Sequence, residues 1–168
     1  MPRRRHTPSG GRGPAESHSV SLPYATATSG DRALVEIQRI LGKFGCQRFG
    51  TAVDAERGVT IVQFRWRERS VSLEASWIGY AEALRRAQPP KRRSRVSEAA
   101  QEQQRIRQAQ ISVCSILRDW CKAQITAIEC GTLSFEAAFL PHMLLPSGER
   151  VIDRIRADKY LPRFEAES

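Results

Sequence analysis

The chain offers few side chains of the types and spacings that catalysis needs. Two of its three histidines, His6 and His18, stand in the N-terminal segment, and only His142 belongs to the body of the sequence. A lone histidine is more often structural than catalytic, because acid–base chemistry needs a nucleophile or carboxylate held beside it. There is no G-x-x-x-x-G-K-[ST] phosphate loop, no dinucleotide-binding glycine pattern and no H-E-x-x-H pair. We therefore expect a protein that is not an enzyme.

The four cysteines also lack the spacing of a metal site. Cys114 and Cys121 stand seven residues apart, and they could meet Cys46, Cys130 and His142 only through the tertiary fold. Zinc sites of the usual kind take ligands two to four residues apart, so a buried cysteine acting as a small apolar residue is the better interpretation. The sequence predicts reduced thiols, no metal and no cofactor, which suits a cytoplasmic protein.

Positive charge is the strongest chemical signal in the sequence. The formal net charge is +9, of which residues 1–28 contribute +3 and residues 85–95 contribute +6, so the remainder is neutral in sum. Both segments contain prolines, and the first is also rich in glycine, a composition that disfavours packed structure. Such segments bind phosphate backbones through counterion release, which makes nucleic acid the leading partner class. The alternative is a solubilising tail and a solvated loop.

Further cations occur at the end of a predicted strand. Arg65, Arg67 and Arg69 surround Trp66, a pattern that could hold phosphates and offer a ring to a base. Because Trp66 shares its strand face with Phe64, core packing is the predicted role of its ring. These three arginines and the nearby basic segment form the strongest predicted patch.

Two cations of a predicted long helix complete the candidate set. Arg118 and Lys122 fall on one side of that helix, where they either extend the patch or belong to a solvated face. None of these residues implies base-specific contacts, so we expect weak sequence preference. The candidate nucleic-acid-binding residues are Arg65, Arg67, Arg69, Arg85, Arg86, Lys91, Arg92, Arg93, Arg95, Arg118 and Lys122.

Apolar periodicity predicts the elements that carry these residues. A helix with Thr28 as N-cap and Gly45 as C-cap precedes three antiparallel strands near 49–53, 59–66 and 71–77. A short helix over 78–87 follows, then a long helix from about Ser97 to Glu129. Its apolar stripe is widened by Ile116. A small C-terminal helical cap ends the fold.

The fold class predicted is α+β in two layers, with helices against one face of a three-stranded antiparallel meander. The other face of the meander should remain uncovered, since its side chains are mostly polar. A length of 168 residues, 40% of them hydrophobic, fits one domain. We expect a disordered basic tail over 1–28, a domain over 29–160 with a basic loop at 85–96, and a polar tail over 161–168. No run is long enough for a membrane span, and the N-terminus lacks the apolar core of a secretory signal.

Several runs of the body resemble a family of small uncharacterised bacteriophage and prophage proteins. They are residues 37–49, the hairpin 62–67, the helix end 127–131, and the pair Phe135-Glu136 followed by 145–148, within a resemblance that covers residues 30–155. The element order is also similar to that of phage single-strand annealing proteins, which set a three-stranded sheet against a long helix and bind single strands in oligomeric rings. The resemblance implies a phage setting and assigns no catalytic residue.

These observations favour a non-enzymatic nucleic-acid-binding protein, with DNA placed before RNA and a role in recombination or replication. The alternative is a protein–protein adaptor or virion component whose basic segments bind an acidic partner. In that alternative Phe135, Phe139 and Leu140 would form an oligomer contact. An enzyme of unfamiliar type is a third alternative, and a homo-oligomer is left open.

Overall fold

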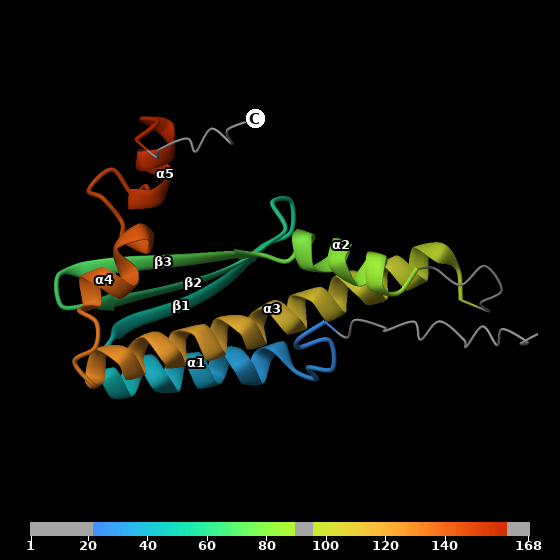
Figure 1. Ribbon diagram of the computed structural model, residues 1–168, viewed down its shortest axis with the longest axis horizontal. Helices are drawn as coiled ribbons and strands as arrows, with labels where there is room; N and C mark the ends of the chain where they lie inside the picture. The colour runs from blue at the N-terminus through green and yellow to red at the C-terminus, as the bar shows by residue number, and fades with distance from the viewer. Residues whose placement is uncertain (1–21, 90–95, 161–168) are drawn as a thin grey trace, which may run out of the picture.

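The computed structural model describes residues 22–89 and 96–160, and it confirms the α+β fold class. Figure 1 shows a three-stranded sheet with two long helices along one side, a short helix at the end of the sheet where the second and third strands meet, and a last short helix beyond the opposite side. The elements are α1 Gly30–Phe44, β1 Gln47–Asp54, β2 Val59–Trp66, β3 Arg69–Ser76, α2 Ile78–Ala87, α3 Glu98–Glu129, α4 Phe135–Phe139, the 3-10 turn η1 Leu140–His142 and α5 Val151–Ala157.

The sheet is the predicted antiparallel meander in the order β1-β2-β3. Tight turns set its register, with Asp54 opposite Val59 and Trp66 opposite Arg69. In the first turn the Asp54 carboxylate accepts the backbone N–H of Arg57 at 3.0 Å, the local bond that makes aspartate a frequent turn residue.

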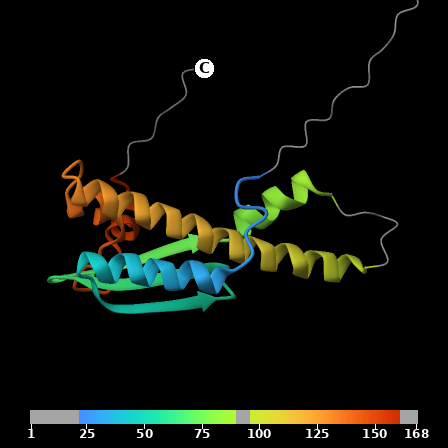
Figure 2. The ribbon, with the colours of Figure 1, turned by 90° about the horizontal axis from the view of Figure 1, so that it is seen from below.

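Helices α1 and α3 lie side by side against one face of the sheet in both views (Figures 1 and 2). The core between these layers contains Ile37, Leu41, Val62, Phe64 and Val113, all buried. Burial of this apolar area is the main stabilising contribution to the fold.

The predicted stripe of α3 was wrong at one position, because Ile116 is exposed. The helix buries the small side chains of Ser112 and Ser115 instead. Small residues allow close approach to a neighbouring segment, and Ser112 is in contact with residues 22–28, as described below.

The first helix begins one residue later than Thr28 would require. Ser29 is the N-cap, and its hydroxyl oxygen accepts the backbone N–H of Arg32 at 3.2 Å. Gly45 ends the helix as predicted, with φ of 95°, a left-handed conformation in which a side chain would be strained.

The second face of the sheet is not left wholly uncovered. Glu74 of β3 lies 3.3 Å from the guanidinium of Arg150, and the same carboxylate accepts a hydrogen bond from Arg57 at 2.6 Å. Ser72, one of the polar residues of β3, is only 3% exposed. The C-terminal segment also adds a bridge to the free edge of β3, where Val71 pairs with Met143. Glu74 on this face therefore binds the C-terminal segment.

The C-terminal cap contributes aromatic residues to the core. Phe135 and Phe139 are 2% and 0% exposed, and Phe139 packs edge-on against Phe64 and Trp120. The predicted oligomer contact of Phe135 and Phe139 is therefore wrong, because neither ring reaches the surface, and only Leu140 is exposed.

The folded body starts before the expected boundary at residue 28. Ser112 donates its hydroxyl to the carbonyl of Tyr24 at 2.9 Å, and Gln108 donates its amide to the carbonyl of Ala27 at 3.0 Å. Leu22 also packs against the core. Residues 22–28 are thus part of the domain, whereas residues 1–21 and 161–168 of the predicted tails lie outside the described residues.

Candidate nucleic-acid interface

The structure separates the predicted cations into distinct places. Arg65, Arg67 and Arg69 come together at the β2–β3 turn, whereas Arg85 and Arg86 lie in the last turn of α2. Strand β3 runs between these two groups and spans about 23 Å. Figure 1 shows the β2–β3 turn at one end of the sheet and α2 beyond the other. The single patch expected from nearness in sequence is therefore two separate surfaces.

At the β2–β3 turn most of the positive charge is neutralised. Arg65 donates to the carboxylate of Glu68 at 3.0 Å, and Arg69 lies 2.8 Å from the carboxylate of Glu136. Arg67 is exposed, with its guanidinium carbon 4.3 Å from the centroid of the Trp66 ring. This turn retains one cation for a ligand.

The Trp66 ring is committed to packing, as predicted. Its centroid lies 4.2 Å from that of Phe135 and 5.6 Å from that of Phe44, both in stacked arrangements. Together with the Arg67 cation these neighbours occupy the ring, so Trp66 is a core residue and not a platform for a base.

The second surface is an arm formed by α2 and the N-terminal part of α3, which extend side by side beyond the sheet in both views (Figures 1 and 2). Arg85 donates to the carboxylate of Glu102, which also accepts from Arg105 at 2.8 Å. The hydrogen bond from Arg85 is the main reason that the pKa of Glu102 is lowered, and Arg105 lowers it further. This carboxylate therefore stays ionised and neutralises part of both arginines.

Arg86 differs from its neighbour in having no acidic partner among the described residues, and it is exposed. The candidates Lys91, Arg92, Arg93 and Arg95 lie outside the described residues. In sequence they follow the end of α2 and precede Ser97, the N-cap of α3. The residues on either side of 90–95 thus belong to the arm.

The two cations of α3 lie toward its C-terminal half. Arg118 donates to Asp119 at 2.8 Å and lies 3.8 Å from Glu36, so its charge is largely balanced. Asp119 also accepts from Tyr24 at 2.8 Å, and its pKa is lowered chiefly by the hydrogen bond from Arg118. Lys122 is exposed and forms no ion pair within the described part of the chain. Of this pair only Lys122 can extend a binding surface.

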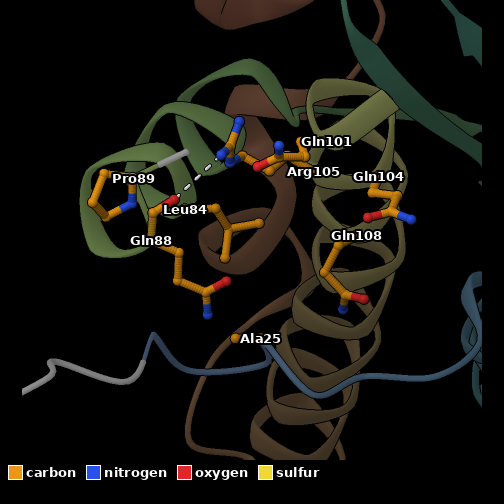
Figure 3. Close-up of a pocket in the computed structure, with 8 residues that line it drawn as sticks. All are labelled: Ala25, Leu84, Gln88, Pro89, Gln101, Gln104, Arg105 and Gln108. Atoms are coloured by element: carbon orange, nitrogen blue, oxygen red, sulfur yellow. Dashed lines mark hydrogen bonds between the residues drawn. The ribbon is translucent and has the colours of Figure 1, made fainter. Parts of the chain in front are cut away.

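A hollow of 370 Å3 lies at the base of the arm, between α2, α3 and residues 22–28. Figure 3 shows Gln88 and Gln108 on opposite sides of it, with Leu84 between them. Sequence reasoning missed this site. The signal available in the sequence was the glutamine-rich start of α3. The hollow also needs residues of α2 and Ala25, which precedes Gln101 by 76 positions. It is lined by Ala25, Leu84, Gln88, Pro89, Gln101, Gln104, Arg105 and Gln108.

His142, the one histidine among the described residues, is half-buried beside Trp120 and Arg150. Burial lowers the pKa of His142, and the nearby charge of Arg150 lowers it further. Its ring packs edge-on against Trp120, with centroids 5.6 Å apart. Across residues 22–89 and 96–160, no three histidine, cysteine, aspartate or glutamate side chains come together as a metal site. All four cysteines fall within these ranges and are free.

Comparison of the chain with protein-family models, curated proteins and solved structures finds no match. The resemblance to small phage proteins therefore stays a prediction. In the described ranges, no helix combines the length and apolar character required to cross a bilayer.

Proposed function

We propose that this protein is a non-enzymatic nucleic-acid-binding protein that holds backbone phosphates with the basic segment 85–95. The nucleic acid proposed is DNA, and the process is phage recombination or replication. The observation that carries the proposal is the local excess of charge. This segment contains six arginines and lysines and no acidic residue. Only Arg85 among its described residues is paired with a carboxylate.

The rest of the folded body supports this assignment by contrast. The described residues contain eighteen arginines and lysines against fifteen aspartates and glutamates, and nine of these cations form ion pairs with described carboxylates. A phosphate backbone gains more from cations that are not already neutralised, because binding then releases counterions without breaking an ion pair.

The position of the segment adds to the argument. It joins the ends of two helices that pack together in an arm, so a bound strand would lie at the end of the molecule remote from the β2–β3 turn. The predicted N-terminal cations Arg3, Arg4, Arg5 and Arg12 would add nonspecific attraction. Arg67 and Lys122 are then secondary contacts.

The test is fluorescence anisotropy of labelled single- and double-stranded DNA, titrated with protein at several salt concentrations. The wild type should bind more weakly as salt rises, with a log–log slope of roughly −0.9 for each phosphate contacted on a duplex. Replacing the six cations of residues 85–95 by glutamine should remove most binding. Unchanged affinity and slope in that variant would overturn the proposal.

A matched pair of single variants sharpens this test. Arg86→Gln and Arg85→Gln remove the same charge from adjacent positions, but only Arg85 has a carboxylate partner. We expect Arg86→Gln to reduce the magnitude of the salt slope by about one, as for a lost phosphate contact. Arg85→Gln should change the salt slope less, because Glu102 already pairs with Arg85 in the wild type and remains paired with Arg105 in the variant. Equal slopes for the two variants would show that ion pairing does not select the contacts.

A further inference from the structure

The outer edge of β1 is the sheet edge that the described residues leave unpaired. β1 pairs with β2 on one side, and no other backbone hydrogen bond within the described ranges reaches it. The opposite edge of the sheet is bridged by the C-terminal segment, since Val71 pairs with Met143 and the carbonyl of Ser70 accepts the N–H of Leu144 at 2.9 Å. Figure 2 shows β1 along the outer border of the ribbon. Such an edge presents a row of N–H and C=O groups to another strand.

The free edge lacks the features that keep most edge strands from pairing. Natural edges are blunted by charges, prolines or bulges. The irregularity of β1 lies between Gln47 and Gly50, and from Gly50 to Asp54 its register with β2 is continuous. Residues 50–53 are uncharged, contain no proline and are all exposed, with Val53 at 60%. This stretch is therefore open to a second strand in regular geometry.

The charges at the two ends of β1 are opposite in sign. Arg48 lies at its beginning, near Lys43 in the last turn of α1. Asp54 lies at its end, and Glu56 follows in the turn to β2. Arg48, Lys43 and Glu56 are exposed and form no ion pair with another described residue. When two β1 strands pair antiparallel, the basic end of one lies beside the acidic end of the other, whereas parallel pairing sets like charges together.

We infer that the outer edge of β1 is a homodimer interface, at which it pairs antiparallel with β1 of a second copy. A two-fold axis near Ala52 sets the regular stretch 50–54 against itself and brings Arg48 of each copy near Glu56 of the other. The assembly closes at two copies, because each copy contributes the same edge and its β3 edge is bridged by its own C-terminal segment. This dimer does not require nucleic acid.

Sedimentation velocity of the full chain over a wide range of protein concentrations tests the dimer. The wild type should pass from monomer to dimer as concentration rises, as expected for a small interface. Ala52→Lys should prevent this, because two lysines would then meet at the axis, and lysine is a natural protection of sheet edges. Ala99→Lys is the matched control, since Ala99 is an exposed alanine in the first turn of α3, and this variant should dimerise like the wild type.

Reversal of the end charges tests the antiparallel orientation. Arg48→Glu and Glu56→Lys each set like charges together at both ends of the paired strands. Each should weaken the dimer about fivefold, the effect of two exposed ion pairs. The two substitutions combined in one chain restore opposite charges and should recover most of the wild-type affinity. Damage to the fold by either substitution would persist in the double variant, so recovery of affinity separates charge pairing from misfolding.

Hydrogen exchange of the β1 amides identifies what occupies the edge. With a second copy as the occupant, protection of residues 50–53 should rise with protein concentration. Protection that is equal at all concentrations in a monomeric protein would mean that another segment of the same chain covers the edge, and it overturns the homodimer. A protein that stays monomeric without any such protection overturns it as well. A dimer that Ala52→Lys leaves intact uses another surface and has the same consequence.

Discussion

Single side chains in this protein are distinguished by their partners more than by their types. Arg85 and Arg86 are adjacent and identical in charge, yet one is bound to Glu102 and the other faces water. The same holds for the cysteines. Cys121 is fully buried and Cys46 is half-buried, and burial raises the pKa of each thiol to about 12. Cys130 is exposed at the end of α3.

This difference predicts the order in which the thiols react. Because the thiolate is the nucleophile, a raised pKa and burial both slow alkylation. With iodoacetamide at pH 8, we expect Cys130 to be modified first and Cys46, Cys114 and Cys121 to react only as the protein unfolds, as followed by mass spectrometry of timed samples. Cys130→Ser should abolish the fast phase. Rapid labelling of Cys121 in the folded protein would contradict the packing described.

At the scale of elements, the helix ends decide where the packed structure begins. The choice between Thr28 and Ser29 as the cap of α1 changes which backbone N–H groups are satisfied. Ser29 accepts from Arg32, and Gly30 packs against α3, where a Cβ at this position would lie 3.5 Å from the sulfur of Cys114. The start of α1 is therefore fixed by its packing as well as by its cap.

Two alanine substitutions separate the possible caps. Ser29→Ala should lower the free energy of unfolding by about 1 kcal/mol, the usual cost of losing a serine cap. Thr28→Ala should change it by less than about 0.5 kcal/mol, because Thr28 is exposed and makes no side-chain bond to the helix. Urea unfolding monitored by circular dichroism measures both. A larger loss for Thr28→Ala would restore the cap expected from the sequence.

At the scale of the whole molecule, residues 22–28 connect elements that the sequence separates widely. Tyr80 of α2 donates its hydroxyl to the carbonyl of Pro23, while Ser112 and Gln108 of α3 donate to Tyr24 and Ala27. This short segment thereby ties both helices of the arm together, and it forms one wall of the hollow through Ala25.

Truncation tests this role of the segment. Removing residues 1–21 should leave the free energy of unfolding within about 0.5 kcal/mol of the full chain, since the contacts described here do not use those residues. Removing residues 1–28 should lower it by roughly 2–4 kcal/mol, because the buried hydroxyl of Ser112 and the half-buried amide of Gln108 lose their acceptors and Leu22 no longer packs against the core. Urea denaturation of the two truncated chains gives the comparison. Equal stability would show that residues 22–28 contribute nothing to the fold.

The sequence alone determined the order of elements and the division of charge. Periods of two and of three to four residues mark strands and helices because each is a local repeat of backbone geometry. Gly45 and Ser97 were recognisable helix boundaries for the same reason, and Trp66 was recognisable as a core residue from the parity of its strand. Net charge by segment is a sum over the sequence and needs no structure.

Only the tertiary structure decided which cations remain available and where they lie. Arg69 meets Glu136 and Arg85 meets Glu102 across 67 and 17 residues, and no local pattern encodes such pairs. The same is true of the hollow, whose walls come from residue 25, from α2 and from α3. Ion pairs and cavities depend on distances between side chains that only packing brings together. The sequence could therefore indicate the kind of partner, while the fold selected the surface proposed to bind it.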